Sequence, residues 1–408
     1  MENAITYLIQ KQGTPFYIFD EKGFIENYNK LESTFRSVYP NYRICYSYKT
    51  NYTPFICNLV KNLGGLAEVV SDMEYELAIR LGYNNEQIVY NGPSKGERMF
   101  EHMFNGGIIN IDSYDEAKRI VSFCNLHLEK KFKCGIRINM DLGGDFISRF
   151  GLEPQSEALT KTVKLIRSQS NMSIVGVHCH ISRSRGYDAW AKRAEIMLKM
   201  ADEIIEGIPE YISLGSGMFA EMSDYLRNQF GPSNIPTYED YCRACIEPIA
   251  KHYDGVENKP MLFTEPGTTV VARYLSFVSK VLSIKNIRGR WIANMDGDYH
   301  NLGEICTMKK LPTYVIPSDR EKVSYEDIDI MGFTCLEQDV MVPSWSGELS
   351  EDDCIVFENV GGYSIVSKPQ FIKPQSAMYV KTSDGHIKQI MRAETFDDVF
   401  GKFNFDFE

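Results

Sequence analysis

Short apolar runs alternate with longer amphipathic stretches from about residue 25 to residue 270. Buried parallel strands read as short apolar runs, and their covering helices read as amphipathic stretches such as 73–81 and 189–205. Eight βα units can close, so the pattern predicts an α/β fold with a TIM-like (β/α)8 barrel. The expected strands are 44–48, 66–70, 88–91, 108–111, 135–139, 174–178, 211–214 and 262–265.

After residue 270 the pattern changes to alternating strands with tight turns. Asp384-Gly385 separates two alternating runs, which is typical of a hairpin. We therefore predict a barrel domain over 25–272 and a mainly antiparallel β-sandwich or β-barrel domain over 273–408, joined by the N-terminal segment 1–24. Expected strands of the second domain include 276–285, 353–358, 378–381 and 387–390.

The composition suits a soluble protein with a small-molecule substrate. The 408 residues are 43% hydrophobic, which is enough for one barrel-sized core and a smaller one. A formal net charge of -11 argues against nucleic acid or an anionic membrane as a partner. Residues 1–10 lack a basic start, and no stretch approaches the roughly 20 apolar residues of a spanning helix. We expect a cytoplasmic protein.

Ten cysteines are scattered without the spacing of a disulfide framework, which predicts reduced thiols. Cys242 and Cys245 form a Cys-x-x-Cys pair in a stretch that reads as helical, 238–247. Because no second pair lies nearby, we interpret them as helix-packing residues rather than as a metal or redox site.

Lys49 ends the apolar, strand-like run 43–48. The carboxyl ends of barrel strands are where barrel enzymes place catalytic groups. A desolvated amine there is partly neutral and can attack an aldehyde, so Lys49 is a candidate Schiff-base lysine. The alternative is a lysine that reaches solvent from a strand end.

His178 and His180 would share one face of a strand, because side chains alternate with period two. No third ligand has a recognisable spacing, so we predict no metal. The alternatives are a histidine stacked on a ring cofactor and a buried structural histidine.

Two further strand ends carry candidate binding groups. Gly215-Ser216-Gly217 offers backbone N–H groups that could cradle a phosphate, although such glycines also form simple turns. Glu265 precedes a Pro-Gly turn, and its carboxylate is either functional or a solvated loop acid.

In their order and spacing, these segments resemble the pyridoxal-phosphate-dependent amino-acid decarboxylases of the alanine-racemase-like fold, which include diaminopimelate, ornithine and carboxynorspermidine decarboxylases. The resemblance covers nearly the whole chain, and no single motif carries it. The motifs are Thr14-Pro15 with Tyr17, Tyr48-Lys49-Thr50-Asn51, 68–71 with Glu74, 91–95, Arg137-Ile138-Asn139, 148–151, His178-Cys179-His180, Gly215-Ser216-Gly217, Glu265-Pro266-Gly267, Cys335 with Asp339, and 358–363.

The resemblance implies pyridoxal 5'-phosphate as cofactor, held by Lys49 as an internal aldimine. Glu265 would hydrogen-bond the pyridine nitrogen and keep it protonated, and His180 would stack on the ring. The segment Gly215-Ser216-Gly217, here called the glycine loop, would bind the phosphate together with Tyr363 and Ser184. The cofactor-binding residues so implied are Lys49, Glu68, Arg137, His180, Ser184, Gly215, Ser216, Gly217, Glu265, Gly267 and Tyr363.

The same resemblance implies that Cys335 protonates the carbanionic carbon after decarboxylation. In this family the cysteine enters the site from the second subunit, so the resemblance implies a homodimer with shared active sites.

Departures from the family pattern bear on the substrate. Thr268 replaces the usual arginine after Glu-Pro-Gly, so one phosphate or carboxylate contact is missing or supplied elsewhere. Leu336 replaces the acid that commonly follows the cysteine in the diaminopimelate and ornithine enzymes, and an apolar side chain cannot pair a buried ammonium. Glu337 would point to the other face of an extended segment, although a loop would bring it back. Asp339 is the other acidic residue of this segment.

Arg183 and Arg185 follow His180 where the common pattern is glycine, serine and glutamine. They suggest anionic groups on the substrate. Alternatively, they replace the positive charge that the phosphate loses because position 268 is threonine and not arginine, or they are ordinary surface charges. The substrate-binding candidates are Arg183, Arg185, Leu336, Glu337 and Asp339.

We therefore predict a carboxy-lyase for an α-amino acid or amino-acid conjugate with an anionic or masked distal group. The alternatives are diaminopimelate or carboxynorspermidine decarboxylase proper, an amino-acid racemase of the same fold, and a non-catalytic cofactor-binding homologue. The second acid/base of a racemase is normally a tyrosine in the C-terminal domain, whereas this chain has the segment from Cys335 to Asp339 that is typical of decarboxylases. Inactive homologues often lose the lysine or the cysteine, and both are present here.

Overall fold

The computed structural model describes residues 1–143, 146–231 and 235–407. The chain divides into two compact units. The barrel unit comprises Tyr28–Phe219 and Asn234–Thr269, and the β unit comprises Met1–Asn27, Ala220–Ser233 and Val270–Glu408. Within the described residues, no helix is long and apolar enough to cross a membrane.

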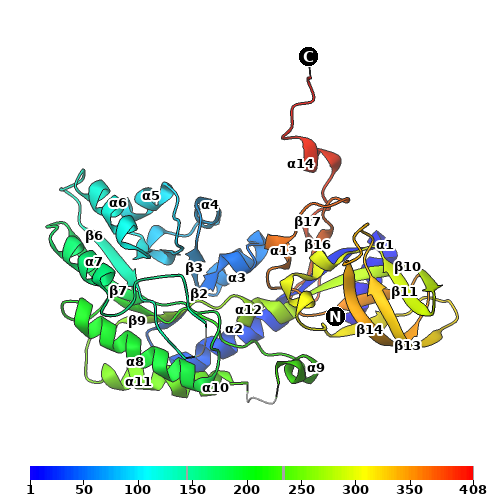
Figure 1. The fold of residues 1–408 in the computed structure, drawn as a ribbon, viewed down its shortest axis with the longest axis horizontal. Helices are drawn as coiled ribbons and strands as arrows, with labels where there is room; N and C mark the ends of the chain where they lie inside the picture. Colours follow the sequence, from blue (N-terminus) through cyan, green and yellow to red (C-terminus); the bar gives the residue numbers. More distant parts are fainter. Residues whose placement is uncertain (144–145, 232–234, 408) are drawn as a thin grey trace. The chain divides into compact units, whose positions relative to one another are not determined.

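Eight parallel strands close a barrel in chain order, which confirms the predicted (β/α)8 architecture (Figure 1). The strands occupy the predicted apolar runs, with ends shifted by no more than three residues. They are β2 (Tyr42–Ser47), β3 (Leu66–Val69), β4 (Ile88–Tyr90), β5 (Ile108–Ile111), β6 (Phe132–Arg137), β7 (Met172–His178), β8 (Tyr211–Ser213) and β9 (Met261–Thr264).

Helices follow the strands along the chain, and the predicted stretches 73–81 and 189–205 correspond to α4 and α8. Cys242 and Cys245 lie in the π-helical turn Cys242–Ile246, where both free thiols are buried, in agreement with a packing role. The helices are α2 (Glu21–Arg36), α3 (Pro54–Asn62), α4 (Asp72–Arg80), α5 (Arg98–Phe104), α6 (Tyr114–Cys124), α7 (Glu157–Arg167), α8 (Tyr187–Ile204), α10 (Tyr238–Tyr241), α11 (Glu247–His252) and α12 (Thr268–Val271).

The turns before α4 and α6 use the same capping arrangement. Oγ of Ser71 accepts the N–H of Glu74 at 3.2 Å, and the Glu74 carboxylate accepts the N–H of Val70 at 2.7 Å. Ser113 and Glu116 repeat both bonds before α6, at 3.2 and 2.7 Å. These caps satisfy backbone donors within each turn, so they hold the ends of β3 and β5 in place.

Tyr211 fills part of the barrel interior. A Cβ atom at Gly135 would lie 1.9 Å from the Tyr211 hydroxyl, and one at Gly176 would lie 2.2 Å from its ring, so both neighbours must be glycine. The hydroxyl donates to Oδ1 of Asn110 at 2.7 Å. Through this bond the packed interior is connected to the polar groups at the strand ends.

The β unit is built on a nine-stranded sheet, in which seven strands follow the order β14-β13-β11-β10-β1-β16-β17. The other two are β15, which also pairs with β10, and β12, which pairs with β15. Most pairs are antiparallel, as predicted, but β1 with β16 and β11 with β13 are parallel. The predicted hairpin is confirmed as β16–β17. The strands are β1 (Phe16–Asp20), β10 (Leu275–Ile287), β11 (Arg290–Met295), β12 (Thr313–Ile316), β13 (Val323–Met331), β14 (Val340–Leu349), β15 (Cys354–Phe357), β16 (Ala377–Lys381) and β17 (Ile387–Met391).

Helices of the β unit are short, apart from the N-terminal one. They are α1 (Glu2–Gln12), α9 (Asp224–Arg227), α13 (Ser364–Ser367) and α14 (Phe396–Phe400).

Candidate functional site

Lys49 lies in a 3-10 turn, Tyr48–Thr50, directly after β2 rather than on the strand itself. Its ammonium donates to Oγ of Ser47 at 2.7 Å and pairs with Oε2 of Glu68. The parallel register of β2 and β3 sets Ser47 beside Glu68, and their side chains are joined at 2.6 Å. A carboxylate so placed can take a proton from Nζ and leave a nucleophilic amine.

Glu265 lies directly after β9, with its side chain only 1% exposed. Oε1 accepts from Oγ of Ser213 at 2.8 Å and from Nδ2 of Asn91 at 3.1 Å, while Oε2 lies 3.0 Å from Nε2 of His178. A carboxylate offers about four lone-pair positions. The three neighbours therefore leave room for one further donor, on Oε2.

Burial by itself would raise the pKa of Glu265. The interaction with His178, which hydrogen-bonds Oε2, and then the charge of Lys49 outweigh burial and hold that pKa below its usual range. Nδ1 of His178 is sealed from solvent and has no partner among the described residues, so a proton there would be unsatisfied. We therefore place the His178 proton on Nε2, where it donates to Glu265.

Asn91 joins the two carboxylates. Its Nδ2 group lies 3.2 Å from Oε1 of Glu68 and 3.1 Å from Oε1 of Glu265, and its Oδ1 accepts from Asn110 at 2.9 Å. The structure thus brings Lys49, Glu68 and Glu265, three residues predicted from the sequence, into one network, in which both carboxylates are buried and Lys49 is half-buried.

His180 lies beyond the end of β7, so the alternation expected for His178 and His180 does not apply. Nδ1 of His180 accepts the N–H of Ser216 at 3.2 Å. Burial lowers the pKa of His180 well below its usual value, and the positive charge of Lys49 adds to this effect. The ring is therefore neutral, with its proton on Nε2. No group of three or more potential metal ligands occurs among the described residues.

The glycine loop after β8 requires glycine on steric grounds. Gly215 and Gly217 have φ values of +59° and +106°, and added Cβ atoms would lie 2.1 Å from O of Cys179 and 2.5 Å from O of Ile181. The backbone N–H groups of Gly217 and Met218 have no acceptor within the described part of the chain. They are available to an anionic ligand.

Arg193 on α8 holds this loop, although no pattern in the sequence identifies it. The buried guanidinium donates to the carbonyl oxygens of Leu214 and Ser216, both at 2.9 Å, and of Ile181 at 3.2 Å. By binding the carbonyls, Arg193 leaves the N–H groups of the loop for a ligand. A single arginine in an amphipathic helix has no spacing that would reveal this role.

Arg137, at the end of β6, supports the His180 segment. Its guanidinium pairs with Asp112 at 3.1 Å, donates to O of His180 at 3.4 Å and lies 4.6 Å from the ring centre of Phe150. Arg137 therefore contacts the backbone that carries His180.

Gly267 lies in the loop that follows Glu265, where this loop approaches the turn that carries Lys49. A Cβ atom there would stand 1.9 Å from Oγ1 of Thr50, next to Lys49. The missing side chain allows the Glu265 loop to approach that turn closely.

Arg183, Ser184 and Arg185 form a loop after β7. Arg183 is exposed, with its guanidinium 4.7 Å from the ring centre of Phe146. Arg185 is half-buried and donates to O of Ser182 at 3.0 Å. Ser184 has a positive φ of 58°, and this turn separates the two arginines.

The remaining predicted residues belong to the β unit. Cys335 and Glu337 are exposed, and Leu336 between them is half-buried. Asp339 is buried, and its oxygens accept the N–H of Tyr299 at 2.9 Å and both the N–H and the hydroxyl of Thr334, at 3.0 and 2.6 Å. Its carboxylate thus organises the loop that carries Cys335.

Tyr363, also in the β unit, is half-buried and has the left-handed φ of 61° at the start of α13. Its predicted phosphate contact stays a prediction.

The barrel-unit groups match what pyridoxal phosphate requires. Oε2 of Glu265 can accept one more donor, such as a protonated ring nitrogen. Two loop N–H groups are available to a phosphate, and Nζ of Lys49 adjoins a proton acceptor. Sequence patterns assign no role to four residues that support these groups, namely Ser47, Asn91, Ser213 and Arg193. Only Asn91 lies in one of the motifs of the resemblance.

Comparisons with known proteins agree with this chemistry. Residues 26–272 match the family model "Pyridoxal-dependent decarboxylase, pyridoxal binding domain". Diaminopimelate decarboxylase from Methanocaldococcus jannaschii is 26% identical over 97% of this chain and 92% of its own length. A probable chloroplastic diaminopimelate decarboxylase from Oryza sativa subsp. japonica is 27% identical over 96% of this chain and 80% of its own length.

The crystal structure of the M. jannaschii enzyme has a TM-score of 0.84 and 25% identity, covering 98% of this chain and 94% of that chain. With the family match spanning more than half of the sequence, the chain belongs to the pyridoxal-dependent decarboxylase family and is a pyridoxal-phosphate-dependent amino-acid decarboxylase.

Proposed function

We propose that the enzyme decarboxylates an α-amino acid or amino-acid conjugate whose distal end is anionic or masked. The observation that carries this proposal is Leu336. Its half-buried apolar side chain follows Cys335 and offers no partner for a distal ammonium. Arg183 and Arg185, on the loop after His180, would instead meet anionic groups.

When bound, pyridoxal phosphate supplies an electron-accepting ring, which takes up the electrons left behind when the substrate carboxylate departs as carbon dioxide. In our proposal Lys49 binds the cofactor covalently, and Glu68 holds and accepts the proton of Nζ. Glu265 keeps a proton at the ring nitrogen, with His178 maintaining its charge. His180 orients the ring.

The phosphate would lie against the N–H groups of Gly217 and Met218, with Ser184 and Tyr363 as further contacts. Cys335 would return a proton to the carbon that has lost its carboxylate. We propose that this cysteine comes from the second subunit of a homodimer. Asp339 would act by shaping the cysteine loop, since its oxygens already bind that loop.

Diaminopimelate decarboxylation is a second candidate function, favoured by the names of the relatives. It would need another acid in place of Leu336 for the distal ammonium. Glu337 is exposed on the same loop and is the residue we would assign to it.

The test is carbon dioxide release by the enzyme supplied with pyridoxal phosphate. L-Lysine, L-ornithine and meso-diaminopimelate should be poor substrates, and L-glutamate or side-chain-acylated lysine should be used better. An unpaired buried charge costs roughly 3–5 kcal/mol, or about two to four orders of magnitude in kcat/KM.

Leu336→Glu should shift the preference toward a basic diamino acid, while the apolar control Leu336→Met should leave it unchanged. Efficient turnover of diaminopimelate by the unmodified enzyme would reject the first candidate in favour of the second. Loss of that turnover in Glu337→Gln would then identify the ammonium partner.

A further inference from the structure

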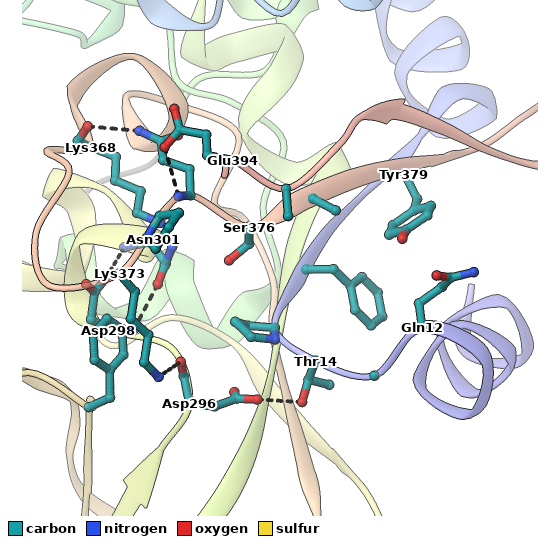
Figure 2. Close-up of a pocket in the computed structure, with 18 of the residues that line it drawn as sticks. Gln12, Thr14, Asp296, Asp298, Asn301, Lys368, Lys373, Ser376, Tyr379 and Glu394 are labelled. Atoms are coloured by element: carbon teal, nitrogen blue, oxygen red, sulfur yellow. Dashed lines mark hydrogen bonds between the residues drawn. The ribbon is translucent and has the colours of Figure 1, made fainter. Parts of the chain in front are cut away.

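The β unit contains a polar cavity of about 460 Å³ that is lined by residues of this unit alone (Figure 2). Its walls come from the connection between α1 and β1, from the loop after β11, and from the segments on either side of the β16–β17 hairpin. None of the barrel-unit residues of the cofactor site lines it. Its volume lies within the range of small-molecule sites.

Lys368 gives the cavity a cation without an ion-pair partner. Among the described residues, no carboxylate lies within 4.0 Å of its Nζ, and no acceptor lies within hydrogen-bond distance. Burial lowers the pKa of Lys368, and the carboxylates of Asp298 and Glu394 oppose this effect from a distance. Figure 2 shows Lys368, Asp298 and Glu394 toward the same end of the cavity.

Glu394 gives the cavity an acceptor that is only partly used. Its Oε2 accepts the N–H of Gln375 at 3.0 Å and the amide of Gln370 at 2.9 Å, whereas Oε1 has no partner in the described part of the chain. Asp296 differs, because both of its oxygens are occupied by Thr14 and by the segment that begins at Ser279.

The open groups are therefore of both signs. A simple anion would suit Lys368 but would meet Asp298 and Glu394, and a simple cation would suit the acids but would meet Lys368 and Lys373. A ligand that carries a carboxylate and an ammonium satisfies both sets with charge-assisted hydrogen bonds.

We propose that this cavity is a second ligand site, which binds a free α-amino acid with its carboxylate at Lys368 and its ammonium at Glu394. The site is separate from the residues that the proposed function uses, so the two proposals can fail independently.

The test is hydrogen–deuterium exchange on the holoenzyme. Each of the amino acids that occur in proteins is added by itself, as the free compound, at millimolar concentration. At least one should slow exchange in peptides that cover 368–376 and 389–394. The cofactor absorbance is recorded in parallel, because it reports binding at the decarboxylase site and not in this cavity. The deaminated acid and the decarboxylated amine of the best ligand should each bind about tenfold more weakly or worse.

Lys368→Met and Glu394→Gln should each weaken the protection at least about tenfold. Lys388→Met is the matched control, because Lys388 is exposed on β17 beside the cavity residue Gln389 and does not line the cavity. Thermal unfolding checks that all variants fold. Absence of protection with every amino acid, equal binding of the deaminated acid, or full protection in Lys368→Met would each overturn the proposal.

Discussion

Glu265 keeps its charge in a buried position because three neighbours donate to its two oxygens. Lys49 is joined to the same network through Glu68 and Asn91. Lys95 differs, because its side chain is fully buried and its ammonium donates to O of Gly92 and to both oxygens of Glu116. The Lys49 side chain is 29% exposed, so an aldehyde can reach its amine, whereas the amine of Lys95 is not accessible.

We predict that the enzyme with bound pyridoxal phosphate is yellow and that borohydride fixes the cofactor to Lys49. Peptide mapping by mass spectrometry should find the reduced cofactor on the Lys49 peptide and leave Lys95 unmodified. Lys49→Ala should lose the covalent link and keep weak binding through the phosphate groups. A protein that stays colourless after addition of the cofactor would contradict this assignment.

We also predict that His178 maintains the charge of Glu265. His178→Phe keeps a ring but removes the donor to Oε2, so the pKa of Glu265 should rise. A hydrogen bond to a charged group contributes about 1.5–3 kcal/mol, so cofactor binding should weaken roughly tenfold to a hundredfold. The measurements are the cofactor dissociation constant and the 15N shift of the labelled ring nitrogen.

His178→Gln supplies an N–H donor in place of the imidazole and should restore much of both properties. Equal loss in the Phe and Gln variants would show that His178 acts only by packing.

At the scale of elements, the turns before α4 and α6 share one capping arrangement but differ in charge balance. Glu116 is paired with Lys95 at 2.8 Å. Glu74 caps its turn without an ion pair among the described residues, and burial raises its pKa to about 7. The same local structure therefore holds an ion-paired carboxylate before α6 and an unpaired, buried one before α4.

The folded pKa of Glu74 lies above the usual value of 4.5, so the folded state holds this proton more tightly than the unfolded state does. Its contribution to stability is full below pH 4.5 and is lost as the pH rises through about 7. Glu74→Gln should therefore gain stability relative to the wild type between pH 5 and pH 8, on the order of 2 kcal/mol, in urea unfolding.

Glu116→Gln is the matched comparison, because it leaves the buried ammonium of Lys95 without a charged partner. This variant should lose about 3–5 kcal/mol of stability both at pH 5 and at pH 8. If Glu74→Gln shows the same loss at pH 8, then the Glu74 carboxylate is ionised without cost.

At the scale of the whole molecule, the proposed catalytic groups belong to different units: Lys49 to the barrel unit and Cys335 to the β unit. We predict that one active site uses Lys49 of one subunit and Cys335 of the other. Mixing inactive Lys49→Ala with inactive Cys335→Ala subunits should restore up to about a quarter of the wild-type activity, since a mixed dimer has one intact site.

Subunit exchange, followed by native mass spectrometry, is the control for this mixing experiment. Exchanged mixtures without activity, or an active monomer in sedimentation, would rule out the shared site.

The sequence alone determined the barrel and the position of its main chemical groups along the chain. Buried parallel strands require continuous apolar runs, and the alternation of these runs with amphipathic stretches shows in one dimension, so the eight strands were predictable. Lys49, His180, Glu265 and the glycine loop were predictable because barrel sites lie at strand ends and their motifs follow in order.

Tertiary structure alone decided which groups meet. Ser47 reaches Glu68 through strand register, His178 reaches Glu265 across 87 residues of sequence, and Arg193 binds the glycine loop from a helix. The parallel pairing of β1 with β16 joins the two ends of the chain in the same way. Periodicity records which side chains are buried, but not which buried groups become partners, because hydrogen bonds depend on the closure of the barrel and of the sheet.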